Sequence, residues 1–394
     1  MTAGLTLGAG ALAAPMLNLG RCRVFADEPG ISTRAVDVVL GSTVIDMLGL
    51  LTLDWDRLYG WWSRPADFGE DEFRSLKRSG IRAFHPAVDT GVADAHEGAR
   101  RWLAGWNALL SSRPCFLARV GTVSELFAAE RLGQIGVIVG FQDSDHFRTP
   151  ADVELFRGLG QSVSQLTYNG RNRIGSGCLV RRDRGLSKLG GEVVAAMDRV
   201  GMAVDVSHCG ERTSIEAIEA SRKPVLVTHS NCKALSPHPR CKSDAVIRRL
   251  AAGGGVMGIT GVRALVGGSS PSLDDLLDHF EHVARLVGVE HVGLGSDVDV
   301  DGVDPTTGRP YLYYQIRGLH LPERVFQIAE GLLRRGYGDR DVGLILGGNF
   351  LRALAVTWPG PPAPPLGRRG SRRDPFCPQA PPVTAASLAG GAPG

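Results

Sequence analysis

The chain has 394 residues, of which 43% are hydrophobic and 22% charged, close to the average of globular proteins. This composition excludes a largely disordered chain and a membrane protein with several spans. The 44 basic and 41 acidic residues give a formal net charge of +3, but the segment from Pro359 onward holds four arginines and one aspartate, which leaves 40 of each sign elsewhere. The body is therefore neutral, which excludes a nucleic-acid-binding surface.

The two ends differ from the body. Residues 1–26 form a signal-like segment, with a small-residue apolar run from Ala3 to Leu17 that is shorter than the roughly 20 residues of a membrane span. No Lys or Arg precedes this run, so an exported (periplasmic) and a cytoplasmic location both stay open. Residues 359–394 contain ten prolines and are predicted to form a disordered tail.

Between these ends, residues 27–358 are predicted to form one domain. Short apolar runs alternate with stretches of helical periodicity. The predicted strands are 43–50, 81–88, 136–141, 162–167, 202–207, 224–228, 255–260 and 291–296. Helices are predicted at 72–79, 153–159, 190–200, 214–221, 244–252 and 273–287, the last with Ser272 as its N-cap.

Eight strands that alternate with helices predict an α/β fold, a single-domain (β/α)8 TIM-like barrel, with a doubly wound sheet as the alternative. Polar side chains follow five of these strands directly, in the segments 140–146, 166–172, 205–209, 228–231 and 295–299. Because the carboxyl ends of barrel strands converge on one mouth, these segments are predicted to form one site.

Two histidines in these segments are candidate metal ligands. His208 and His229 end neighbouring predicted strands, which places them roughly 5 Å apart and allows both imidazoles to bind one divalent ion. A hydrogen-bonded structural role remains the alternative for each. Asp297, after the last strand, is a candidate ligand or proton-transfer group, because a carboxylate can take a proton from water and return it to a leaving amine. Its alternative role is to cap the following loop.

Arg240 lies in a loop that Pro237 and Pro239 stiffen. A rigidly held guanidinium can make a two-pronged hydrogen bond to a carboxylate. We therefore predict that Arg240 binds a substrate carboxylate, with a solvated loop arginine as the alternative.

Several segments together form a recognisable series. Residues 165–172 read Q-L-T-Y-N-G-R-N, 185–191 read G-L-S-K-L-G-G, and 197–208 read M-D-R-V-G-M-A-V-D-V-S-H. Further on stand V-L-V-T-H-S at 225–230, P-H-P-R at 237–240, H-V-G-L-G-S-D at 291–297 and G-G-N-F-L-R at 347–352. From about Thr43 to Leu354 the series resembles that of the membrane (renal) dipeptidases, zinc metallopeptidases with an amidohydrolase-like barrel.

The resemblance implies a two-zinc site that cleaves the peptide bond of dipeptides by metal-activated water. In that scheme His208 and His229 hold one ion, while an H-x-D pair on the first strand and a glutamate after the third strand complete the other. Arg240 binds the terminal carboxylate of the substrate and Asp297 handles protons. Tyr168 stands where the family has a histidine near the substrate carbonyl, and its hydroxyl can still donate one hydrogen bond there, so it is a candidate catalytic residue beside Asp297. Tyr168 and Asn169 also complete the predicted substrate-binding residues. Family members often pair as dimers, so the resemblance also implies a homodimer.

The sequence departs from the family at the first ion. Leu48 and Leu50 stand where the histidine and aspartate of the H-x-D pair belong, and Gln142 stands at the bridging glutamate. Leucine cannot bind a metal, and a neutral amide oxygen bridges two Zn²⁺ ions poorly. We therefore expect one zinc ion, bound more weakly, with His208, His229 and Gln142 as its protein ligands.

Five other residues are candidate substitutes for the lost ligands. Asp46 has the same parity as Leu48 along the first strand and is expected to face inward. The remaining candidates are His85 after the second strand and Asp143, Asp145 and His146 after the third.

Three functions follow. The first is a dipeptidase-like metallohydrolase. The second is a catalytically impaired relative that binds a small carboxylate ligand, and the third is a repurposed enzyme acting on another amino-acid derivative. The retained histidines and aspartate favour an enzyme, because buried polar groups cost free energy when they are unpaired.

Overall fold

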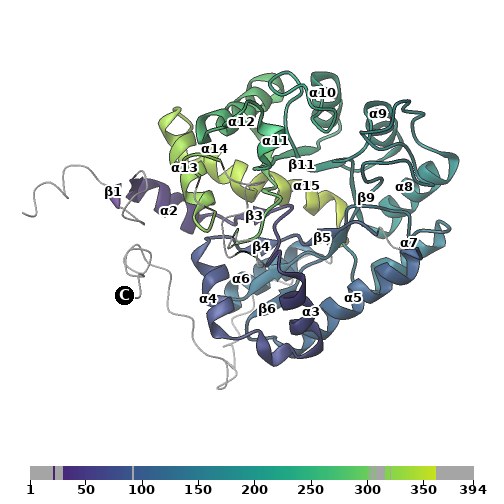
Figure 1. The fold of residues 1–394 in the computed structure, drawn as a ribbon, viewed down its shortest axis with the longest axis horizontal. Coiled ribbons are helices and arrows are strands. Elements are labelled where there is room, and N and C mark those ends of the chain that lie inside the picture. Colours follow the sequence, from purple (N-terminus) through teal and green to yellow (C-terminus); the bar gives the residue numbers. More distant parts are fainter. Residues whose placement is uncertain are drawn as a thin grey trace, which may run out of the picture.

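The computed structural model describes residues 21–22, 30–90, 93–300, 302, 307, 316–319 and 321–360 (Figure 1). The signal-like segment 1–26 and the tail 359–394 lie almost entirely outside the described residues, so both remain predictions. Within the described part, none of the helices is both long enough and apolar enough to cross a membrane.

The predicted (β/α)8 barrel is confirmed. The strands are β3 (Ile45–Asp46), β4 and β5 (Ala83–Phe84, Ala87–Val88), β7 and β8 (Ile135–Val137, Gly140–Phe141), β9 (Val163–Gln165), β10 (Ala203–Asp205), β11 (Leu226–Ser230), β12 (Val256–Ile259) and β13 (Val292–Leu294). They pair in parallel in this order, β4 with β5 and β7 with β8 each making one barrel position. The N–H of Met47 donates to the carbonyl of Leu294 at 2.9 Å and joins the first strand to the last. Each of the eight predicted strands overlaps an observed one.

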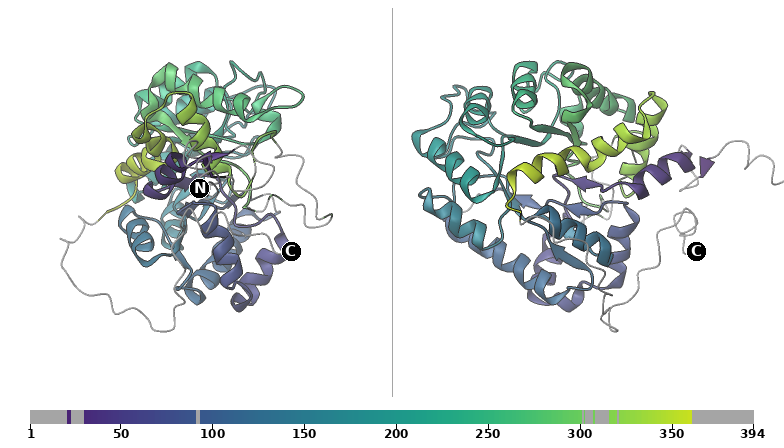
Figure 2. Two further views of the ribbon diagram at one scale, coloured as in Figure 1. Left: turned by 90° about the vertical axis from the view of Figure 1, so that its left-hand side faces the viewer. Right: turned by 180° about the vertical axis from the view of Figure 1, so that it is seen from behind.

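Helices surround the barrel (Figures 1 and 2). They are α2 (Thr33–Gly41), α3 (Trp55–Ser63), α4 (Glu70–Arg78), α5 (Ala95–Ser112), α6 (Val123–Leu132), α7 (Ala151–Gly158), α8 (Lys188–Val200), α9 (Glu211–Ala220), α10 (Asp244–Ala252), α11 (Arg263–Val266), α12 (Leu273–Val287), α13 (Arg324–Arg334), α14 (Asp339–Gly343) and α15 (Asn349–Thr357). All six predicted helices are present, and Ser272 caps α12 as expected.

The sequence-based prediction lacked one edge strand and eight of the described helices, namely α2, α3, α5, α6, α11, α13, α14 and α15. Helix α5 contains Gly105, and a Cβ there would lie 2.3 Å from the ring of Trp62, so this glycine allows the ring to pack closely on the helix. Glycine also has a low helix propensity, which weakens the prediction of a helix from the sequence. Strand β6 (Leu117–Arg119) pairs with β7 as an additional edge strand. A short antiparallel pair, β1 (Arg21–Cys22) with β2 (Ile31–Ser32), precedes the barrel.

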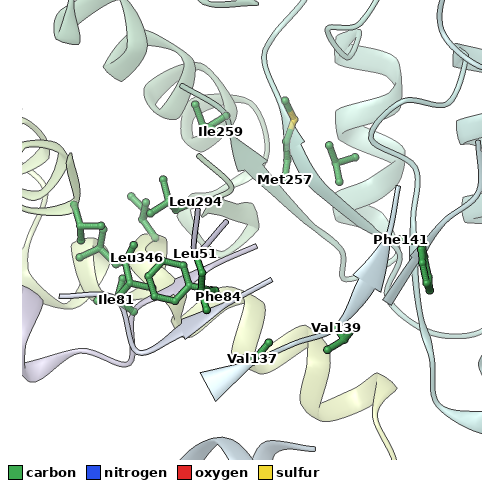
Figure 3. Close-up of a cluster of buried hydrophobic side chains, with 14 of the residues drawn as sticks. Leu51, Ile81, Phe84, Val137, Val139, Phe141, Met257, Ile259, Leu294 and Leu346 are labelled. Atoms are coloured by element: carbon green, nitrogen blue, oxygen red, sulfur yellow. The ribbon is translucent and has the colours of Figure 1, made fainter. Parts of the chain in front are cut away.

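The hydrophobic core has two layers. The larger one lies between the strands and the surrounding helices, and Figure 3 shows part of it, including Phe84, Val137 and Leu294. The smaller one fills the inside of the barrel, where Phe350 and Leu354 of α15 pack with buried side chains from seven of the eight barrel positions, namely Ile45, Ala83, Ile138, Val163, Ala203, Leu226 and Val256. Helix α15 therefore closes one end of the barrel, and Figure 2 shows it running across the strands.

Asp46 faces the outer layer, so the expectation that it points into the barrel is wrong. Its neighbours Ile45 and Met47 belong to the interior cluster, which turns the intervening side chain outward. There the Asp46 carboxylate pairs with Arg324 of α13 at 3.0 Å and accepts hydrogen bonds from Ser296 N at 2.8 Å and Ser296 Oγ at 2.5 Å. Asp46 is thus occupied by a buried ion pair and cannot replace a lost metal ligand.

The substitution Phe350→Ala tests the closure of the barrel by α15. Because Phe350 is fully buried, we expect the free energy of unfolding to fall by about 3–5 kcal/mol. Val356→Ala, on the same helix at 58% exposure, is the matched control and should change it by less than about 0.5 kcal/mol. Urea denaturation measures both, and equal effects would contradict the packing of α15 against the strands.

Candidate metal and substrate site

A cavity of about 350 Å³ opens at the carboxyl ends of the barrel strands. Six of the predicted site residues line it: Gln142, Tyr168, Asn169, His208, Arg240 and Asp297. The seventh, His229, is fully buried beside His208. The structure therefore brings the predicted site residues to one place, in a cavity of a size typical of small-molecule sites.

The two histidines converge on each other. His208 follows β10 and His229 lies on β11, and their Nε2 atoms are 3.0 Å apart. The separation of the ring centroids is 5.1 Å. The parallel neighbouring strands thus place the imidazoles together as the sequence predicts, while their role as ligands remains a prediction.

The protonation of His229 follows from its partners. Thr228 Oγ1 donates its proton to Asp205 Oδ2 at 2.6 Å, because a carboxylate can only accept. Thr228 Oγ1 must then accept at its 2.8 Å contact with His229 Nδ1. His229 is therefore protonated on Nδ1, and its Nε2 carries a lone pair.

The same argument applies to His208. Its Nδ1 lies 2.8 Å from Asn169 Oδ1, an amide oxygen that can only accept, so the proton sits on Nδ1. The ring also stacks on Tyr168, with centroids 4.3 Å apart. Asn169, predicted to bind substrate, thus orients His208.

Two lone pairs therefore face each other across 3.0 Å. Burial, and secondly the charge of Arg240, lower the pKa of both rings well below the ordinary value of 6.5, so neither Nε2 is protonated at neutral pH. Two neutral acceptors at this distance cannot hydrogen-bond to each other, whereas a shared cation satisfies both. The separation is compatible with two nitrogen ligands at about 2.0–2.1 Å from one zinc ion. The pair therefore fits one metal ion.

A third ligand of the usual type is not in place. Within the described residues, no group of three His, Cys, Asp or Glu side chains is arranged to hold a metal ion. Gln142 lines the cavity, and its Nε2 donates to Ala87 O at 3.0 Å. This bond fixes the amide group of Gln142 and leaves its Oε1 as a neutral donor for a metal.

The position of the family's other ion is apolar. Leu48 is fully buried, Leu50 is 7% exposed, and Leu50 lines the cavity. Neither offers a donor atom, so these residues do not fit a second ion.

The other candidate substitutes have different partners. Asp143 accepts from Asn172, Asp145 pairs with Arg173, and the Nε2 of His146 bonds Gln161. His85 donates from Nδ1 to Met47 O at 2.6 Å, and its buried Nε2 has no partner in the described chain. A Cβ at Gly140 would lie 2.2 Å from this Nε2, so the ring of His85 lies against Gly140 of the neighbouring strand β8. None of these residues joins His208 and His229 in a metal-binding group within the described part of the chain.

Arg240 is held rigidly inside the cavity wall. It is 4% exposed, and its Nη1 and Nη2 donate to the carbonyls of Ser207 and His229. These bonds tie the guanidinium to the strand ends that carry both histidines. Its Nε is itself buried and has no hydrogen-bond partner among the described residues.

Asp297 has an unusual backbone conformation. Its φ of 60° lies in the left-handed region, which aspartate tolerates better than most residues. Its N–H donates to Leu48 O at 2.7 Å, and the preceding Ser296 is bonded to Asp46. The Asp46–Arg324 pair therefore helps to position Asp297 although it lies outside the site.

Three supporting residues were not identified from the sequence. Asp205 and Thr228 fix the tautomer of His229, and the carboxylate three residues before His208 in D-V-S-H was the available signal. Lys242 is buried and donates to Val206 O at 2.6 Å and Cys209 O at 2.9 Å, which holds the segment that carries His208. Burial lowers its pKa to about 8. No local pattern reveals Lys242, because its acceptors lie more than thirty residues away.

Comparison with known proteins gives one family. The model of the membrane dipeptidases, peptidase family M19, matches residues 91–357, a range that begins after Leu48 and Leu50. The chain is 33% identical over 242 residues to the dipeptidase verJ of Clonostachys rogersoniana, covering 59% of this chain and 58% of that protein. It is 30% identical over 239 residues to the dipeptidase aclJ of Aspergillus oryzae, covering 59% of this chain and 51% of that protein. The chain thus spans only about half the length of these curated relatives.

Solved structures agree on the fold. An amidohydrolase from Pseudomonas aeruginosa superimposes with a TM-score of 0.69 at 27% identity, over 82% of this chain and 99% of that one. The metallopeptidase described as dipeptidase AC superimposes with a TM-score of 0.63 at 19% identity, over 80% of this chain and 99% of that one. The second likeness supports the barrel architecture alone.

Asp297 should titrate near neutrality. Burial raises its pKa to about 7, Arg240 opposes this and Asp46 adds to it. Since the folded-state pKa exceeds the unfolded value near 3.8, the folded protein binds the extra proton, and the stability contributed by that proton is lost as pH rises from about 4 to about 7. Relative to Asp297→Asn, the unfolding free energy of the metal-free wild type should fall by at most about 1.4 kcal/mol per pH unit. If the unfolding free energies of the wild type and Asp297→Asn depend on pH in the same way, the raised pKa of Asp297 is contradicted.

Proposed function

Since this chain belongs to the membrane dipeptidase family, peptidase family M19, we propose that it hydrolyses the peptide bond of dipeptides or related small amides with one divalent metal ion. The observation that carries the proposal is the pair of Nε2 lone pairs 3.0 Å apart beside the cavity that Arg240 and Asp297 line. A site that only binds a carboxylate gains no binding energy from two imidazoles whose unprotonated Nε2 atoms face each other.

Family membership implies a metal cofactor, and we propose that it is a single zinc ion. His208 and His229 would hold it, with the amide oxygen of Gln142 as the third protein ligand, and imidazole nitrogen suits zinc. When bound, the ion polarises the substrate carbonyl and lowers the pKa of a water molecule. Leu48 and Leu50 leave no donors for a second ion.

The remaining residues bind and orient the substrate. The Nε of Arg240, which has no partner among the described residues, would bind the terminal carboxylate of a dipeptide. The Tyr168 hydroxyl, on the ring that stacks on His208, would donate a hydrogen bond to the substrate carbonyl oxygen. The Asn169 amide NH₂ stays available to substrate because the contact with His208 uses only Oδ1.

Asp297 would carry the protons. With a pKa of about 7 it is poised to accept a proton from the attacking water and to deliver it to the amine that leaves. The backbone N–H of Asp297 donates to Leu48 O, and the neighbouring Ser296 is bonded to Asp46. These bonds hold the Asp297 carboxyl in position without using the carboxyl oxygens. Proton transfer therefore needs no rearrangement of the loop.

Metal content tests the single-ion site. Protein purified without chelator should contain about one zinc per chain by mass spectrometry, and His208→Ala should contain none. Thr228→Val removes the acceptor of His229 Nδ1–H and should weaken zinc binding by about 10- to 100-fold in a competition titration, while Thr228→Ser should restore it. Two zinc ions per chain would contradict the claim that Leu48 and Leu50 leave no site for a second ion. A protein without zinc would favour the relative that only binds a carboxylate ligand.

Hydrolysis tests the reaction. The zinc-loaded protein should release amino acids from a panel of dipeptides that includes D-residues at the carboxyl end, and Asp297→Asn should lower kcat by about 100-fold or more. Arg240→Lys, which keeps the positive charge, should raise KM for dipeptides more than for the corresponding dipeptide amides, which lack the carboxylate. If no dipeptide or amide is cleaved while zinc is bound, a repurposed enzyme or a binding protein replaces the hydrolase.

A further inference from the structure

The mouth of the barrel is divided into a polar and an apolar side. In the order of strands around the barrel, β3 lies opposite β10, and β4 with β5 lies opposite β11. The loops after β9, β10 and β11 carry Tyr168, His208 and Arg240. Across the cavity, β5 and the segment after β3 present a group of apolar side chains, Leu50, Leu53, Trp55, Ala87 and Val88. The other apolar residues that line the cavity, Leu179, Ala264 and Leu265, lie after β9 and β12.

The apolar side is preformed. Leu50 N donates to Val298 O at 3.2 Å, and Leu53 N donates to Asp299 Oδ2 at 2.8 Å. Asp54 accepts from Arg57 N at 3.0 Å and caps α3, so Trp55 begins a helix with a fixed direction. Trp55 nevertheless remains 39% exposed, which leaves its ring accessible to a ligand.

Carboxylates border this apolar side. Asp89 follows β5 and Asp297 follows β13, the strands on either side of β3, and both line the cavity. A ligand whose carboxylate sits at Arg240 therefore has its far end beside apolar side chains that acidic residues flank. An amino-terminal residue with an ammonium group and an apolar side chain has this chemistry.

We propose that the substrate is a dipeptide with a large apolar, preferably aromatic, amino-terminal side chain, which packs on Leu50, Leu53 and Trp55. The proposal rests on the proposed function, because Arg240 must hold the carboxylate for the far end to reach this wall. Burying a side chain of that size should strengthen binding by about 10- to 100-fold over a methyl group.

Calorimetry with uncleavable ligands tests the proposal without depending on turnover. The ligands are ketomethylene analogues of Phe-Gly and Ala-Gly, in which CH₂ replaces the peptide NH. The zinc-loaded wild type should bind the Phe analogue about 10- to 100-fold more tightly than the Ala analogue. Trp55→Ala should reduce this preference to a few-fold and leave the affinity for the Ala analogue unchanged, whereas Trp55→Phe should keep most of it.

Phe127→Ala is the matched control. Phe127 lies on α6, is 39% exposed as Trp55 is, and is not among the residues that line the cavity, so its removal should not alter the preference. Equal binding of both analogues by the wild type would overturn this inference and leave the proposed function standing. If neither analogue binds, the proposed function fails and the inference fails with it.

Discussion

The site depends on two imidazole lone pairs that are forced to face each other. His208 and His229 are locked in the Nδ1–H form by Asn169 on one side and by the Thr228–Asp205 pair on the other. Burial together with Arg240 prevents either ring from taking a second proton, so the repulsion cannot be relieved internally. The packed barrel, which holds β10 and β11 in fixed register, maintains this arrangement, and the shared cation that we propose would stabilise it.

Electrostatics also supports the proposal of a single ion. Arg240, whose guanidinium bonds the carbonyls of Ser207 and His229, already places a positive charge near the pair. A second divalent ion would need carboxylates to compensate it, but the first strand offers leucines and the carboxylate of Asp46 is neutralised by Arg324 in the outer layer. The carboxylates that would hold a second ion are thus missing here. Asp46 instead accepts a hydrogen bond from the backbone N–H of Ser296, next to Asp297.

Much of this could be predicted from the sequence, for physical reasons. Buried parallel strands are short apolar runs, so all eight were found, and strand ends must meet at the mouth, so His208, Arg240 and Asp297 were placed together. The direction of Asp46 was not predictable, because β3 has two residues and the partner Arg324 lies 278 residues away. Helix α5 was not predicted because Gly105 weakens its helical pattern, and the need for a glycine there is visible only from the close approach of the Trp62 ring. The tautomers likewise depend on contacts that pairs of strands create.

Leu50 changes the surface that the cavity presents to a ligand, and together with Leu48 it leaves no donor atom for a second ion. A carboxylate or imidazole at position 50 would attract a cation, whereas Leu50 at 7% exposure extends the apolar surface of Leu53 and Trp55 up to the edge of the site. Affinity for the far end of a ligand must then come from burial of apolar area, about 25 cal/mol per Å². Coordination cannot supply it there. Because the loop after β3 is bonded to Val298 and Asp299, that surface is rigid, and a rigid apolar wall selects ligands by side-chain shape.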